Sequence, residues 1–436
     1  MNARLARTVA RHALGWLVAA NGVGVWLAAL LLWPELNSGA GVLTYGRLMP
    51  LHMDWQLYGW CSLPLVGVLA GWILAPDDAV GARQAEWAVW AWSAALALGG
   101  VSWLAGVTSG KLFLDWSGWA RPLLPVAMLF LWSVLGAATW ARRRRLSIGA
   151  RVARGAALMV LLAVPLTLYW AAGREVYPSV NPDSGGATGA SLLGSTLGIV
   201  AVGGWVPWAL GLKRVEGRSG ARRLFWAAFG GALFVYAATD RGHVSHHAVA
   251  QIAALGTLLI WVPLVWVYFR AHVWPAGAGK WLAAAFAWWT LLVASGWMVF
   301  WPGLSERFKF THVLVAHAHL AMAGAVTSLG AALLVALGCG PGGGRAGFWV
   351  WQAACVVQVG TLVGIGILET GNAGEFFVGA GWVDAWFAVR LASGVAMAGA
   401  SVVWWWGGVG AEAARDRLQA GSYLQTGSAV AKEGER

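Results

Sequence analysis

The sequence is poor in cysteine, with only Cys61, Cys339 and Cys355 among 436 residues. None of them belongs to a CxxC pair or a CxxCH motif, so we expect no disulfide framework, no cysteine-rich metal site and no haem attached covalently in the c-type manner. The glycine-rich run from Cys339 to Gly344 is not followed by the GK[ST] element that a phosphate-binding loop requires.

Charge is also scarce. Charged residues make up 11% of the chain and hydrophobic residues 59%, whereas a soluble domain has about 25% charged and about 45–50% apolar residues. Long apolar stretches recur from end to end, and the 33 tryptophans suit a membrane–water boundary. The composition therefore excludes a string of soluble domains and predicts an all-α, polytopic membrane helical bundle.

The apolar stretches divide into about twelve predicted transmembrane helices. A span needs about 20 apolar residues, and the fifth and seventh stretches are the shortest. We expect one transmembrane domain over 1–410 and a polar cytoplasmic tail over 411–436. The predicted spans are 13–33, 48–74, 86–107, 122–140, 154–172, 190–212, 224–240, 247–270, 281–301, 311–337, 347–368 and 383–408.

The net charge is +12, but the basic residues lie in short loops between spans, so topology explains them better than nucleic-acid binding does. If the N-terminus is cytoplasmic, 22 of the 30 Lys and Arg residues fall in cytoplasmic segments. This excess predicts a multi-pass protein of a bacterial-type inner (plasma) membrane with both termini in the cytoplasm.

The nine histidines carry the functional signal. His12 and His272 lie in predicted cytoplasmic segments, and the other seven lie at predicted outer ends of spans. Ionisable groups in a membrane are costly and mark functional sites, and neutral imidazole commonly binds iron and copper. The seven are His52, His243, His246, His247, His312, His317 and His319.

His317 and His319 are two residues apart, which is about 200° of rotation on a helix. They therefore point to opposite sides, and one helix could provide ligands to the iron of two haems. An intramembrane histidine can instead form a helix–helix hydrogen bond, and the spacing alone leaves that alternative open.

Two motifs resemble those of a known family. The run from Tyr45 to His52, continuing to Trp60, resembles the second-helix motif of haem-copper oxidase subunit I, closest to the C-family (cbb-type) form, and the run from Thr311 to His319 resembles its tenth-helix HxH motif. The resemblance implies two b-type haems. His52 and His319 would ligate a low-spin haem, His317 would ligate a high-spin haem, and Arg47 would be a cofactor-binding residue.

The family also binds copper opposite its high-spin haem. His246 and His247 resemble the copper-binding pair, but Ser195 falls where the resemblance expects a sixth-helix histidine. Either His243 supplies a third nitrogen, or the copper site is altered or lost. Tyr236 is the nearest candidate for the family's catalytic tyrosine.

The resemblance implies a respiratory-chain catalytic subunit that passes electrons from a cytochrome c through low-spin haem b to a high-spin haem that reduces oxygen. Its expected partners are the lipid bilayer, a c-type cytochrome subunit and other respiratory subunits, with no nucleic acid. Two alternatives remain. One is a degenerate oxidase paralogue that binds haem b for electron transfer or gas sensing, and the other is a membrane transporter with structural histidines.

Overall fold

The chain folds into one bundle of long helices. The computed structural model describes residues 1–433, and their side chains except for residues 377–378 and those from 409 onward. Helices dominate, and the described residues contain two isolated β-bridges and no strand. The predicted all-α class is confirmed.

The helices run in the following order and bounds: α1 (Ala3–Leu32), α2 (Leu36–Gly39), α3 (Tyr45–Asp54), η1 (Trp55–Cys61), α4 (Leu63–Ile73), α5 (Ala79–Leu104), η2 (Gly118–Ala120), α6 (Leu123–Arg142), α7 (Ile148–Ala171), α8 (Gly189–Ala209), α9 (Gly220–Ala238), α10 (Val249–Gly256), η3 (Thr257–Ile260), α11 (Trp261–Arg270), α12 (Ala278–Met298), α13 (Leu304–Phe308), α14 (His312–His319), η4 (Leu320–Val326), α15 (Thr327–Ala336), α16 (Gly344–Val378) and α17 (Gly381–Glu433). η1 and η4 are π-helices, and η2 and η3 are 3₁₀-helices.

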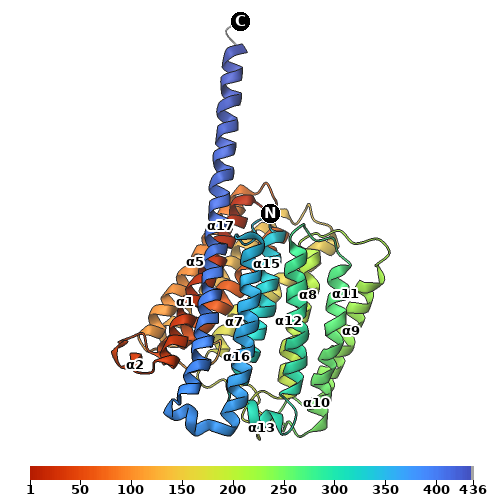
Figure 1. The fold of residues 1–436 in the computed structure, drawn as a ribbon. Helices are drawn as coiled ribbons and strands as arrows, with labels where there is room; N and C mark the ends of the chain where they lie inside the picture. The colour runs from red at the N-terminus through yellow and green to blue at the C-terminus, as the bar shows by residue number, and fades with distance from the viewer. Residues whose placement is uncertain (434–436) are drawn as a thin grey trace.

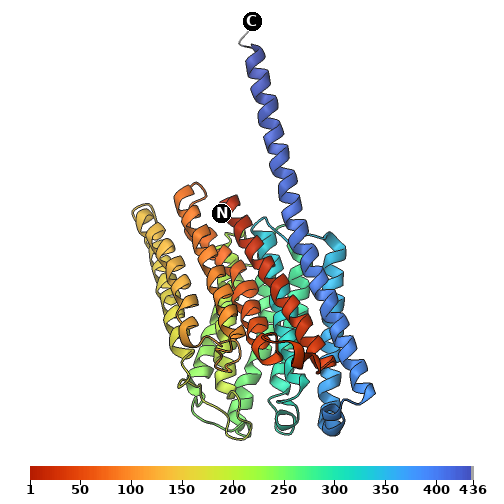
Figure 2. The ribbon, with the colours of Figure 1, turned by 90° about the vertical axis from the view of Figure 1, so that its left-hand side faces the viewer.

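Eleven helices of the described chain are long and apolar enough to cross a membrane. Each coincides with a predicted span, so the chain is a multi-pass membrane protein. The remaining predicted span is α9, which carries Arg222 and Arg223 in its first turn and falls outside that set. α9 nevertheless packs against α8 and α11 in the bundle. The two termini lie at the same end of the bundle (Figures 1 and 2).

The first and last long helices, α1 and α17, pack against each other. On α1, Leu5, Val9, Ala13 and Leu17 recur every four residues and are buried, which is the spacing of one helical face. α1 packs along α17 and also against α3, α4 and α5. This arrangement places α1, α3 and α17 around one interior space.

α17 continues beyond the other helices as a long projecting helix (Figure 2). The predicted tail over 411–436 begins in this projection and is helical as far as Glu433. The polar character predicted for the tail concerns side chains outside the described residues.

The predicted orientation leads to a labelling experiment. Val42, in the α2–α3 connection, and Ile148, at the start of α7, are 49% and 73% exposed. We expect Val42→Cys, in a background without the native cysteines, to react with an impermeant maleimide added to intact cells. Ile148→Cys should react only after the membrane is opened. The reverse pattern would contradict a cytoplasmic N-terminus.

Candidate functional site

Two of the predicted ligand histidines come just before π-helical turns. α3 carries His52 and passes directly into η1, and α14 ends at His319 and passes directly into η4. π-turns are rare and occur frequently at functional sites. The two π segments contact each other, and Trp60 of η1 donates a hydrogen bond of 2.8 Å to the Thr327 hydroxyl at the end of η4.

His52 and His319 have the same local geometry. The Nδ1 of His52 lies 2.8 Å from the carbonyl oxygen of Ala20, and the Nδ1 of His319 lies 2.8 Å from that of Val315. A carbonyl can only accept, so each Nδ1 carries the proton and donates it. Each Nε2 is then a lone pair, which is the form of imidazole that binds a metal.

Both histidines line one cavity of about 270 Å³ between α1, α3, α14, α16 and α17. Its walls are largely apolar and include Val25, Met49 and Met397. Gly24 of α1 also lines it, and a Cβ atom there would lie 2.7 Å from Cε1 of His52. That distance is shorter than the usual contact distance between two carbon atoms. The His52 ring can therefore occupy its position only because residue 24 is glycine.

A buried ionic group forms one part of the cavity wall. Arg390 of α17 is 8% exposed, and its guanidinium lies 3.0 Å from Nε2 of His312. Nδ1 of His312 lies 2.5 Å from Oε1 of Glu369, whose other oxygen accepts the backbone N–H of His312. His312 therefore links the guanidinium to the carboxylate, and Nε of Arg390 has no hydrogen-bond partner.

The residue types that line this cavity are those that a b-type haem would need. The cavity offers two imidazole lone pairs from separate helices, apolar walls, and a guanidinium with hydrogen-bonding capacity left over for a carboxylate. Arg47 does not line the cavity, because its guanidinium donates to the carbonyl of Leu104, 2.8 Å away.

His317 faces a different neighbour. Its Nδ1 lies 3.1 Å from the hydroxyl of Ser295 on α12, and a Cβ atom at Gly296 would lie 3.0 Å from its Cε1. The cavity lined by His319 does not include His317. The predicted divergence of the two rings is therefore observed, with His317 against α12.

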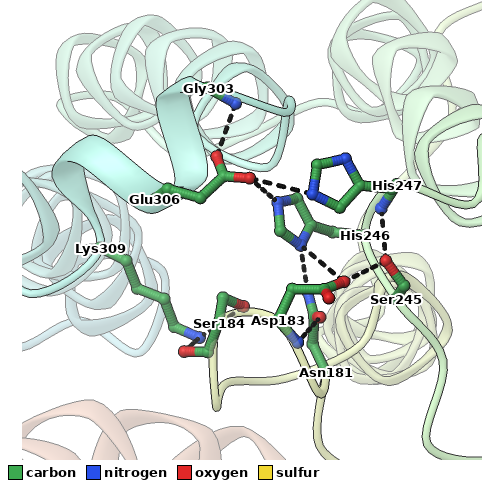
Figure 3. Close-up of polar contacts among 9 residues, drawn as sticks. All are labelled: Asn181, Asp183, Ser184, Ser245, His246, His247, Gly303, Glu306 and Lys309. Atoms are coloured by element: carbon green, nitrogen blue, oxygen red, sulfur yellow. Dashed lines mark hydrogen bonds and ion pairs between the residues drawn. The ribbon is translucent and has the colours of Figure 1, made fainter.

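A second cluster of histidines lies near α13 and the start of α10, at the end of the bundle opposite the termini (Figures 1 and 3). His246 is fully buried. Its Nε2 lies 2.8 Å from Oε1 of Glu306, and the Nε2 of His247 lies 3.2 Å from the same oxygen. Asp183, from the loop before α8, approaches Nδ1 of His246 to 3.9 Å.

Glu306 is the ionised centre of this cluster. Its own backbone N–H lowers the pKa of its carboxyl most, and hydrogen bonds from His246 and from the N–H of Gly303 lower it further. Lys309 lies close in the chain, but its ammonium bonds to the carbonyl and hydroxyl of Ser184 (Figure 3).

These residues do not fit a copper site with three imidazoles. His243, one predicted third ligand, is exposed and bonds through Nδ1 to the backbone of Val180. Ser195 is exposed, and its hydroxyl donates to the carbonyl of Leu192 in its own helix. The ring of Tyr236 packs against Gly194, and Arg241 stacks over it. Carboxylates, rather than a third imidazole, lie beside His246 and His247.

Comparison with known proteins gives one partial likeness. No protein-family model matches the chain. A stretch of 131 residues, 30% of the chain, is 27% identical to the Cbb3-type cytochrome c oxidase subunit CcoN1 of Stutzerimonas stutzeri. The match covers 27% of that relative, so about a quarter of its length is represented. This likeness supports a haem-copper oxidase-like relationship.

Four residues of these sites were not predicted. Arg390 is a charged residue inside a predicted span and Glu369 directly follows one, which is a signal that sequence alone contains. Asp183 lies in a loop and Glu306 on the short helix α13, where carboxylates are ordinary. They join the site only because the fold brings them to histidines about 60 residues away in the chain.

The group formed by Arg390, His312 and Glu369 leads to a prediction about stability. Glu369→Gln removes the charge that compensates Arg390, and breaking a buried pair costs about 3–5 kcal/mol. We expect a smaller loss, about 2 kcal/mol, because the Glu369 side chain remains 21% exposed. The thermal-unfolding midpoint in detergent should fall by several degrees, whereas Glu35→Gln in an exposed connection should leave it unchanged. Equal midpoints for the two variants would contradict the assigned role.

Proposed function

We propose that this chain is a membrane-embedded b-haem protein of haem-copper oxidase-like ancestry, and that it transfers electrons through a haem ligated by His52 and His319. One observation carries the proposal. Two histidines on separate helices line the same apolar cavity, and each uses its Nδ1–H on a backbone carbonyl, which leaves its Nε2 as a lone pair. The bond from His52 also joins α3 to α1, but it uses only one nitrogen of the ring.

The residues of the chain would prepare this site before any cofactor binds. The carbonyls of Ala20 and Val315 fix the ring tautomers and orientations. The apolar walls exclude water, and Arg390 places a positive charge at the cavity, which favours the reduced state of a redox centre beside it. A haem held by His52 and His319 would supply a one-electron redox centre.

A second candidate function is oxygen reduction at another haem, bound by His317. It is favoured by the divergence of His317 and His319 on α14, and it would require the high-spin haem and copper of the oxidases. We place electron transfer first because carboxylates, rather than a third imidazole, lie beside His246 and His247. A c-type cytochrome remains the proposed donor, and other respiratory subunits remain the proposed partners.

Substitution of the ligands tests the proposal directly. We expect His52→Ala and His319→Ala each to abolish the low-spin α-band in the dithionite-reduced spectrum, because each removes one axial imidazole. His12→Ala should retain the band, since His12 of α1 bonds to Ser93 of α5 and does not line the cavity. A band of normal intensity in either ligand variant would refute the assignment.

The glycine beside His52 provides a subtler test. Gly24→Ala places a methyl group where the His52 ring lies, so the ring must move. We expect the α-band to weaken by more than half and the haem content to fall. Gly22→Ala is the matched control on the same helix, because nothing lies within 4 Å of the added atom. If both variants bind haem like the wild type, Gly24 does not position His52.

A further inference from the structure

The cluster around His246 has a donor set of its own. One ligand atom from each of Asp183, His246 and His247 lies within 4.8 Å of the others. The three come from the loop before α8 and the segment before α10, and Glu306 of α13 closes the group (Figure 3). The described cysteines lie elsewhere in the bundle, on or beside other helices, so the donors are imidazole and carboxylate only.

The hydrogen bonds fix the tautomer of His246. The Oδ1 of Asn181 accepts the backbone N–H of Asp183, so the amide nitrogen of Asn181 faces Nδ1 of His246 at 2.8 Å. The amide can only donate there, so Nδ1 is a lone pair and Nε2–H donates to Glu306.

This leaves two electron-rich groups facing each other. Nδ1 of His246 accepts the Asn181 N–H, and Oδ2 of Asp183, 3.9 Å from that nitrogen, accepts the Ser245 hydroxyl. A divalent cation attracts both of these lone-pair donors. A cation bound there would replace the Asn181 N–H as the partner of the lone pair.

We propose that Asp183, His246 and His247 bind a zinc-class divalent cation at the end of the bundle opposite the termini. Glu306 would not bind the cation but would orient both imidazole rings by accepting hydrogen bonds from them. Imidazole with carboxylate is a donor set that Zn²⁺ accepts readily. Glu306 matches the second carboxylate that commonly orients metal-bound histidines, because one of its oxygens meets the Nε2 atoms of both rings. This inference is independent of the proposed haem site.

The site is also accessible. The side chains of Asp183 and His247 are 40% and 55% exposed, whereas His246 is fully buried. A cation can therefore reach the exposed ligands from solvent and then engage the buried one. Once bound, it would connect the segment before α10 to the loop before α8 and, through Glu306, to α13.

Cobalt titration tests this proposal, because Co²⁺ replaces Zn²⁺ and gives visible absorption bands that depend on coordination. The full chain, stripped with chelator, should bind one Co²⁺, which Zn²⁺ then displaces. His247→Ala and Asp183→Asn alter exposed side chains, so they should fold, and they should lose the bands at cobalt concentrations that saturate the wild type.

Two further variants separate the site from its surroundings. Glu306→Gln should weaken cobalt binding by about 10–100-fold, the usual effect of removing an outer carboxylate. His243→Ala is the matched control and should bind like the wild type, because His243 bonds to Val180 instead. His52→Ala should also bind cobalt normally, which distinguishes failure of this site from failure of the haem site.

Three results would overturn the proposal. The first is absence of cobalt bands in the wild type. The second is unchanged binding in both His247→Ala and Asp183→Asn. The third is stoichiometric copper in the protein as purified that is lost in His243→Ala, since that would identify a copper site with three imidazoles.

Discussion

Two hydrogen bonds from imidazole Nδ1–H to backbone carbonyls set the tautomers of His52 and His319, and with them the lone pairs that these rings offer to the cavity. His52 uses its Nδ1–H on the carbonyl of Ala20 in α1, and His319 uses its Nδ1–H on the carbonyl of Val315 in its own helix. Each ring thereby satisfies only one of its two nitrogens. The Nε2 lone pair of each ring therefore remains available in the cavity that both rings line.

The local helix geometry serves the same end. Where α3 and α14 pass into the π segments η1 and η4, the helices change their winding just after each histidine. Trp60 joins the two π segments by its bond to Thr327. Gly24 clears the space for the His52 ring, and Arg390 brings a positive charge that Glu369 compensates through His312. Contacts in and around the cavity wall thereby hold a site that is assembled from α1, α3, α14, α16 and α17.

Much of the fold could be predicted because hydropathy reports directly on membrane spans. Every predicted span coincides with a helix, and only α9, weakened by Arg222 and Arg223, lies outside the apolar set. His52 and His319 could be predicted from short motifs, and the structure places both on one cavity. The copper ligands could not, because a third ligand depends on which loops meet at the end of the bundle. His243 forms its hydrogen bond with Val180 instead. The carboxylates that contact His246 belong to Asp183 and Glu306, which are remote from it in the sequence. The π-turns have no sequence pattern that would have revealed them.

The central claim is that one haem iron in this chain is ligated by two imidazoles. Electron paramagnetic resonance of the oxidised, purified protein, combined with haem quantitation, tests it most directly. We expect a low-spin ferric signal of the bis-imidazole type that corresponds to one haem per chain. A protein without haem, or one whose only ferric signal is high-spin, would contradict it.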